Sequence, residues 1–174
     1  MIATYASSFS FNRKFVLSAL QILGASLFIA LCAQIRIPLP FGFVPFTCQT
    51  FAVMLVGAAL GSRKGLFAVL AYLTEGALGL PFFANGCLLS VTGGYLLGFA
   101  FQAYLVGWFA ERQQKGLSLL LGMCLASAVQ LGLGALWLSS FVGPQMAFTI
   151  GFYPFILIEL AKAVMVTLCL SKKS

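Results

Sequence analysis

The sequence contains no histidine among its 174 residues, and only three acidic residues accompany its ten lysines and arginines. Without histidine the chain cannot build Ser-His or Cys-His catalytic pairs, or His-ligated zinc and haem sites. The P-loop string G-x-x-x-x-G-K-[ST] is absent, so the chain is not itself a P-loop ATPase. The five cysteines are scattered singly and form no C-x-x-C motif. We therefore expect a protein that is not an enzyme and that carries no metal ion or other cofactor.

Apolar residues dominate what is present. Hydrophobic residues make up 61% of the chain and charged residues 7%, and the mean hydropathy is +1.06. Soluble domains are far more polar, so the chain is predicted to be an all-α integral membrane protein. Its length allows about six spans of roughly 20 residues with short connections. We expect a six-transmembrane-helix bundle that forms one membrane domain over residues 1–174.

Six apolar segments are the candidate spans. They lie at about 15–34, 48–62, 64–80, 94–110, 117–140 and 149–170. The first follows a short N-terminal tail, residues 1–14, and together with that tail it resembles a signal sequence. Because the apolar run continues without a convincing small-x-small cleavage site, we interpret it as a retained span.

The basic residues predict an orientation. If both termini are cytoplasmic, eight of the ten basic residues lie inside, Arg36 alone lies outside and Lys162 lies within a span. The eight are Arg13, Lys14, Arg63, Lys64, Arg112, Lys115, Lys172 and Lys173. This bias is typical of the positive-inside rule. It also accounts for the net charge of +7 without a nucleic-acid partner, because these residues lie in pairs at helix ends and form no basic face.

Polar residues gather on the predicted outer side. Two connections there, 35–50 and 80–95, are rich in proline, glycine and aromatic residues. Five candidate ligand contacts lie in or beside them: Thr47, Gln49, Asn85, Thr92 and Tyr95. Thr47 and Thr92 are equally compatible with helix N-caps, Asn85 with a turn and Tyr95 with an interfacial aromatic belt.

Glu159 and Lys162 lie in the middle of the last apolar segment. An ionised group at that depth costs roughly 2.5–3.5 kcal/mol, so it usually faces the protein interior. Residues three apart lie on the same side of a helix. The pair therefore indicates either a buried ion pair that steadies packing or, as we favour, part of a polar ligand site in an outward-facing cavity.

Three stretches of sequence resemble the BioY family. VPFTCQTFAVMLVGAALG (44–61) is similar to the family's V-P-x-T-x-Q-T-x-x-V segment. GALGLPFFANG (76–86) and TGGYLLGF (92–99) resemble its G-x-x-G-L-P-x-F-A stretch and its G-P-T-G-G-Y-L-x-G-F signature. PFILIELAKA (154–163) resembles the P-F-L-P-G-D-L-x-K-A segment of its last helix. The chain departs from the pattern at Ser90 and Val91, at Leu157 and Ile158, and at Glu159, where Asp is typical. Glu75 occupies a position that is usually apolar.

The resemblance implies a function. BioY proteins are biotin-binding S components of energy-coupling factor (ECF) transporters in bacterial cytoplasmic membranes. The expected partners are therefore biotin, the lipid bilayer, an ECF transmembrane coupling subunit and ATP-binding subunits. Glu159 and Asn85 have the hydrogen-bonding groups to bind the ureido ring of biotin, and Lys162 has the charge to bind its carboxylate. Which end of biotin meets Glu159 or Lys162 stays open.

Two other functions are compatible with the residues. One is an ion- or proton-coupled secondary carrier for biotin or another small carboxylate, with Glu75, Glu159 and Lys162 as a relay. The other is a membrane scaffold that transports nothing. Binding to the coupling subunit is predicted at small residues of the first span, Ala25 and Ala30. Small residues allow helices to approach closely in lipid, and they serve equally for packing inside the bundle.

Overall fold

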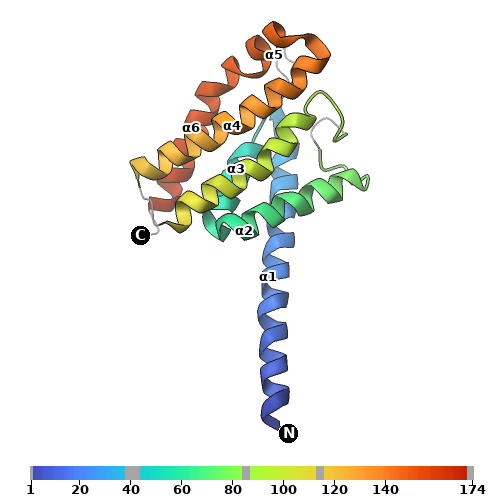
Figure 1. Ribbon diagram of the computed structural model, residues 1–174, viewed down its shortest axis with the longest axis vertical. Helices are drawn as coiled ribbons and strands as arrows, with labels where there is room; N and C mark the ends of the chain where they lie inside the picture. Colours follow the sequence, from blue (N-terminus) through green and yellow to red (C-terminus); the bar gives the residue numbers. More distant parts are fainter. Residues whose placement is uncertain (1, 38–43, 84–86, 113–115, 172–174) are drawn as a thin grey trace.

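The computed structural model describes residues 2–37, 44–83, 87–112 and 116–171. Its helices are α1 (Ile2–Gln34), α2 (Gln49–Ala77), α3 (Gly93–Glu111), α4 (Leu117–Val142), α5 (Pro144–Gly151) and α6 (Tyr153–Ser171). Two-residue strands, β1 (Arg36–Ile37) and β2 (Phe46–Thr47), pair antiparallel between α1 and α2. The predicted helical class is confirmed, with this strand pair as the one addition in the described part of the chain (Figure 1).

Four helical stretches among the described residues are long and apolar enough to cross a membrane: Arg13–Gln34, Gln49–Ala77, Leu117–Val142 and Pro144–Leu170. The protein is therefore a multi-pass membrane protein. At 19 residues α3 also has nearly the length of a span. It packs closely between α2 and α4, with buried residues such as Phe99 and Ala103 along its length.

Helix α2 reverses its direction at Gly61, whose φ of +84° is a conformation that suits glycine. Beyond the bend the second half returns along the first. A Cβ atom on Gly65 would lie 3.0 Å from the Cα of Gly57, and the side chains of Gln49 and Tyr72 meet by a hydrogen bond. The two short spans predicted at 48–62 and 64–80 correspond to these halves, with the break two residues earlier than Arg63.

The last predicted span, 149–170, is interrupted. Gly143, with φ +83°, ends α4, and Pro144 begins the separate short helix α5. Proline suits the first turn of a helix because its missing N–H has no helical partner there. A turn at Gly151 and Phe152 then leads into α6, which starts four residues later than the predicted span. Helix α5 was not predicted.

The elements that carry the predicted outer residues lie at one end of the bundle. In Figure 1, α5 and the strand pair lie toward this end, and the start of α1 and the end of α6 lie toward the other. Between these ends buried apolar clusters join α1 to α2 and α3, and join α3, α4 and α6 to one another.

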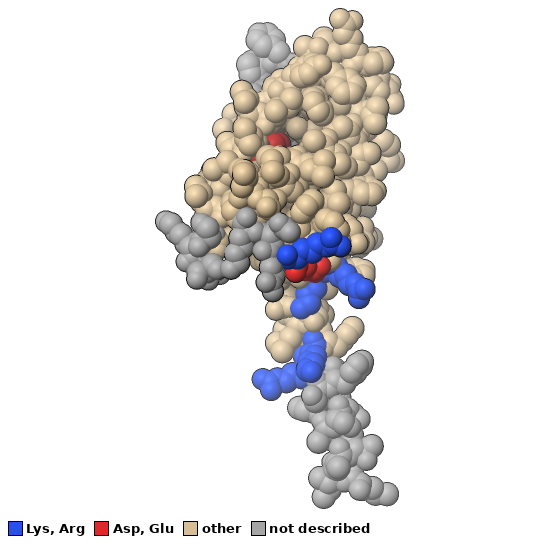
Figure 2. All heavy atoms as spheres, turned by 60° about the vertical axis from the view of Figure 1, so that its left-hand side comes forward, with Lys and Arg blue, Asp and Glu red and all other residues tan. Residues whose placement is uncertain are grey.

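Basic side chains gather at the opposite end. Figure 2 shows them near the point where α1 leaves the body of the protein, with acidic atoms beside them. Lys64 donates to Gln21 of α1, and Arg112 stacks on Trp108 of α3. Glu111 accepts two hydrogen bonds from Ser62, one from the backbone N–H and one from Oγ. Of the eight residues predicted inside, Lys115, Lys172 and Lys173 lie outside the described residues.

Candidate functional site

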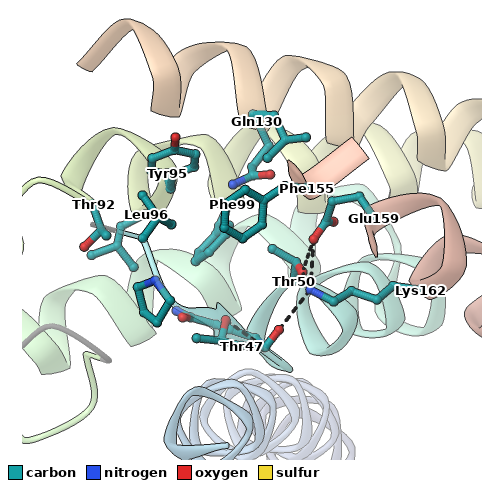
Figure 3. A pocket seen from close by; sticks show the side chains of 14 residues that line it. Thr47, Thr50, Thr92, Tyr95, Leu96, Phe99, Gln130, Phe155, Glu159 and Lys162 are labelled. Carbon is teal, nitrogen blue, oxygen red and sulfur yellow. Dashed lines mark hydrogen bonds and ion pairs between the residues drawn. The ribbon is translucent and has the colours of Figure 1, made fainter. Parts of the chain in front are cut away.

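A cavity of about 50 Å³ lies among the segment before α2 and helices α2, α3, α4 and α6 (Figure 3). Its walls combine aromatic and aliphatic side chains with a few polar groups. The lining residues are Val44, Pro45, Thr47, Gln49, Thr50, Thr92, Tyr95, Leu96, Phe99, Gln130, Leu131, Phe155, Glu159 and Lys162. Six of the seven predicted ligand contacts are among them. The seventh, Asn85, lies outside the described residues.

Glu159 and Lys162 form an ion pair on one wall of this cavity. Lys162 Nζ lies 2.9 Å from Glu159 Oε1, and both residues are buried, at 7% and 3% exposure. Thr50 of α2 bridges the pair, because its hydroxyl donates to Glu159 Oε1 at 2.6 Å and accepts from Lys162 Nζ at 2.6 Å. We call these three residues the Glu159 network. It couples the start of α2 to the middle of α6.

The two charged groups of this network differ in how many of their hydrogen-bonding positions are paired. Besides Thr50 and Glu159, Lys162 donates to the backbone carbonyl of Thr47 at 2.9 Å, so all three donors of its ammonium have acceptors. Its Nζ also lies 4.8 Å from the centre of the Phe46 ring. Glu159 Oε2, in contrast, is buried and has no hydrogen-bond partner among the described residues. The network therefore offers the cavity an unused carboxylate acceptor.

Gln49 connects the cavity to a loop. Its side-chain N–H donates to the hydroxyl of Tyr72 at 2.7 Å, and that hydroxyl donates to the carbonyl of Phe82 at 3.2 Å. Gln34 of α1 also donates to the carbonyls of Pro81 and Phe82. The segment after α2 is thus tied both to the cavity wall and to the end of α1.

The structure shows the partners of three lining residues for which the sequence allowed a purely structural role: Thr47, Thr92 and Tyr95. The hydroxyl of Thr47 accepts from the N–H of Gln49 at 3.4 Å, next to the start of α2. Thr92 Oγ1 shares a 2.9 Å hydrogen bond with Ser90 Oγ just before α3. Tyr95 is 4% exposed and donates to the carbonyl of Gly151 at 2.7 Å, which excludes a belt tyrosine at the membrane surface.

Two polar lining residues were not predicted. Thr50 follows the predicted Gln49 directly, and its role depends on the rotation of α2 against α6. Gln130, from α4, is 1% exposed, and its Oε1 has no hydrogen-bond partner among the described residues. A signal existed for Gln130, because it interrupts the apolar segment 117–140 in the same way that Glu159 and Lys162 interrupt theirs.

Three other residues singled out from the sequence lie away from the cavity. Glu75 accepts a 3.1 Å hydrogen bond from Ser26 of α1 and is not a lining residue. Ala25 and Ala30 are 9% and 4% exposed and belong to the core between α1 and α2. These two alanines pack inside the bundle, so the chain does not present them on an open surface.

Comparison with known proteins finds similar sequences over most of the chain. Residues 6–173 match the BioY family. The chain is 36% identical over 165 residues to the biotin transporter BioY2 of Lactococcus lactis, covering 90% of this chain and 89% of that protein. It is also 36% identical over 155 residues to the biotin transporter BioY of Thermotoga maritima, covering 85% of this chain and 92% of that protein.

A solved structure is similar over nearly its whole length. It is the 2.1 Å crystal structure of the S-component for biotin from an ECF-type ABC transporter. The TM-score is 0.80 at 26% sequence identity, and the match covers 91% of this chain and 90% of that chain. The fold, the family match over residues 6–173 and the two relatives agree, and this chain belongs to the BioY family.

Proposed function

We propose that this chain takes up biotin as the substrate-binding S component of an ECF-type transporter, capturing the vitamin from the outer face of a bacterial cytoplasmic membrane. Family membership and the names of the similar proteins support the choice of substrate. The single observation that carries the proposal is the Glu159 network on a wall of a buried cavity that is otherwise lined largely by apolar side chains.

Biotin matches the chemistry of these walls. Its ureido ring has two N–H donors and one carbonyl acceptor, its thiophane ring is apolar, and its tail ends in a carboxylate. Glu159 Oε2 accepts no hydrogen bond from the described residues, so it can accept a ureido N–H, and the bond would be charge-assisted. Tyr95, Phe99 and Phe155 supply apolar surface for the rings. Thr47, Gln49, Thr92 and Asn85 are the further contacts that we propose.

The ion pair also favours one orientation of biotin. Because Lys162 and Glu159 touch each other, they act at one place and do not reach both ends of the ligand. A carboxylate placed there would be repelled by Glu159, whereas a neutral ureido group can donate an N–H to Glu159 Oε2 without bringing two like charges together. We therefore propose that the ureido ring binds at the Glu159 network and that the biotin carboxylate lies toward the mouth of the cavity.

For the membrane arrangement we propose six crossings within one domain, residues 1–174, with both termini in the cytoplasm. The two halves of α2, separated at Gly61, then count as two short crossings, and α5 with α6 counts as one. The position of Lys64 beside Gln21, and of Arg112 near Ser62 and Glu111, supports a common cytoplasmic end for the basic residues.

Transport would depend on separate subunits. We propose that an ECF transmembrane coupling subunit and ATP-binding subunits supply the energy, since this chain has no P-loop motif. The exposed face of α1 is the docking surface that we propose in place of Ala25 and Ala30. Leu27 and Leu31 on that face are 50% and 69% exposed. The secondary-carrier alternative has no specific observation in its favour, because Glu75 bonds to Ser26 and does not line the cavity.

The test is isothermal titration of the purified protein with biotin, in wild type and in Lys162→Met. Saturable binding of one biotin per chain is expected in wild type. The variant should lose about 1.5–3 kcal/mol of binding free energy, because Lys162 holds Glu159 in place and Glu159 makes the proposed charge-assisted hydrogen bond to the ureido N–H. Lys64→Met, at the opposite end of the bundle, is the matched control and should bind as wild type does. The absence of saturable biotin binding in folded wild-type protein would overturn the proposal.

Uptake into proteoliposomes separates the two transport modes. Uptake by this chain is expected only with the coupling subunit, the ATP-binding subunits and ATP. Uptake by the chain alone that collapses with the proton or sodium gradient would favour the secondary carrier.

A further inference from the structure

The cavity contains a second buried acceptor that the Glu159 network does not use. Gln130 lies near the middle of α4 and enters the cavity from a different wall, above Phe99 and Phe155 in Figure 3. Its Oε1 has no hydrogen-bond partner among the described residues. A buried polar group without a partner is unfavourable, so a side chain held in this state in a ligand cavity calls for an explanation.

Gln130 is held firmly in place. Glycine at position 98 of α3 lets the two helices approach closely, because a Cβ there would meet the Gln130 carbonyl at 3.0 Å and its Cγ at 3.1 Å. The stem of the side chain is therefore fixed between α3 and α4, and its amide projects toward the cavity (Figure 3). A fixed amide loses little conformational entropy when a ligand binds to it.

The unpaired acceptors of the cavity match the donors of the ligand. Glu159 Oε2 and Gln130 Oε1 are the buried side-chain oxygens of the described lining residues that lack a partner. A ureido ring has two N–H donors. Resting on the function proposed above, we infer that Gln130 accepts one ureido N–H while Glu159 accepts the other, so that Gln130 is a specificity-determining residue of the biotin site.

A matched control exists in the same protein. Gln102 of α3 is 0% exposed and its Oε1 also lacks a partner among the described residues, yet it does not line the cavity. Its amide N–H donates to Ser127 Oγ at 3.1 Å instead. Gln102→Met therefore makes the same substitution at a similarly buried position, without touching the proposed contact.

The experiment measures affinity for biotin and for the two biotins methylated at one or the other ureido nitrogen. Gln130→Met should weaken biotin binding by about five- to twentyfold, the scale of one buried hydrogen bond. One of the two methylated biotins should bind Gln130→Met nearly as well as biotin itself does. The methyl group of that isomer removes the N–H whose proposed acceptor, Gln130 Oε1, is already absent from the variant. The other isomer should show this behaviour in the double variant Glu159→Met/Lys162→Met, which removes the second acceptor together with its counter-ion. In Gln102→Met, both isomers should be discriminated as in wild type.

The affinity ratio between biotin and each methylated isomer is independent of the fraction of folded protein. If Gln130→Met does not fold, Gln130→Asn withdraws the amide by one methylene and gives the same readout. Unchanged biotin affinity in Gln130→Met, or unchanged discrimination of both isomers, would overturn the inference while leaving biotin binding itself intact. Failure of wild type to bind biotin would instead overturn the proposed function.

Discussion

At the scale of single residues, the Glu159 network contributes both to the stability of the fold and to the proposed biotin site. Lys162 and Glu159 are buried in a helix that crosses the membrane, and each compensates the charge of the other. Removing one partner of a buried pair leaves an uncompensated charge, which is far more destabilising than removing both. The network therefore holds α2 against α6 even before a ligand arrives.

We predict that Lys162→Met lowers the stability of the ligand-free protein by about 3–5 kcal/mol, because Glu159 then lacks its counter-ion. The double variant Glu159→Gln/Lys162→Met should lose less than Lys162→Met alone. Thermal unfolding in detergent, followed by circular dichroism, measures both. Lys64→Met is the control, since Lys64 is half-buried, has only Gln21 as its side-chain partner among the described residues and should contribute about 0–1 kcal/mol, as surface charges do. Equal melting temperatures for Lys162→Met and Lys64→Met would contradict this account.

Sequence reasoning found the residues of the site whose chemistry is unusual for their surroundings. Glu159 and Lys162 were predicted because charge is rare in apolar segments, and both line the cavity. Thr50 was missed, because threonine is unremarkable in a helix and only the packing of α2 on α6 brings its hydroxyl to both charges. The alternatives for Tyr95 could be separated only by its hydrogen bond to Gly151, which depends on α5.

At the scale of secondary-structure elements, the reversal of α2 brings Gln49 and Tyr72 together and so builds one wall of the cavity. The sequence indicated the break through Arg63 and Lys64, but the turn itself is made by Gly61. Helix α5 could not be predicted from hydropathy, since it contains no charged residue and runs directly into the apolar span that follows. Only the positive φ of Gly143 and the proline after it separate α5 from α4.

Replacement of Gly61 by alanine should destabilise the fold by about 1–3 kcal/mol, because a residue with a Cβ is strained at this φ. The added Cβ would also collide with the carboxylate of Glu111. Gly132→Ala in α4 is the matched control. A Cβ there meets no atom within 4 Å, and alanine favours a helix over glycine by roughly 0.5–1 kcal/mol. Unfolding midpoints in a denaturing detergent titration should therefore move in opposite directions, and a parallel shift would refute the assigned role of Gly61.

At the scale of the whole molecule, the ends of the bundle differ in charge. The described residues Arg13, Lys14, Arg63, Lys64 and Arg112 belong to segments at the end that we propose to be cytoplasmic. The cavity residues come from segments nearer the other end, apart from Gln130, Glu159 and Lys162 deeper in the bundle. The family could be predicted from short motifs. The six predicted crossings stay a prediction, because α2 is bent and α5 interrupts the last apolar segment.

Single cysteines at Leu89, Met146 and Leu117 test this orientation, after the five native cysteines are replaced. Leu89 is 72% exposed, Met146 53% and Leu117 70%, so each position is accessible to a reagent. A membrane-impermeant maleimide should label positions 89 and 146 in intact cells. Position 117 should react only after permeabilisation. The reverse pattern would place the cavity on the cytoplasmic side and exclude capture from outside.

The size of the cavity has a kinetic consequence. At about 50 Å³ it is far smaller than the roughly 300–1,000 Å³ of sites for drug-sized ligands. We therefore predict that the walls separate when a molecule as large as biotin enters or leaves. On this prediction, opening of the walls slows both association and dissociation. The lifetime of the loaded chain, as well as its affinity, would set how long captured biotin stays bound before the coupling subunits act.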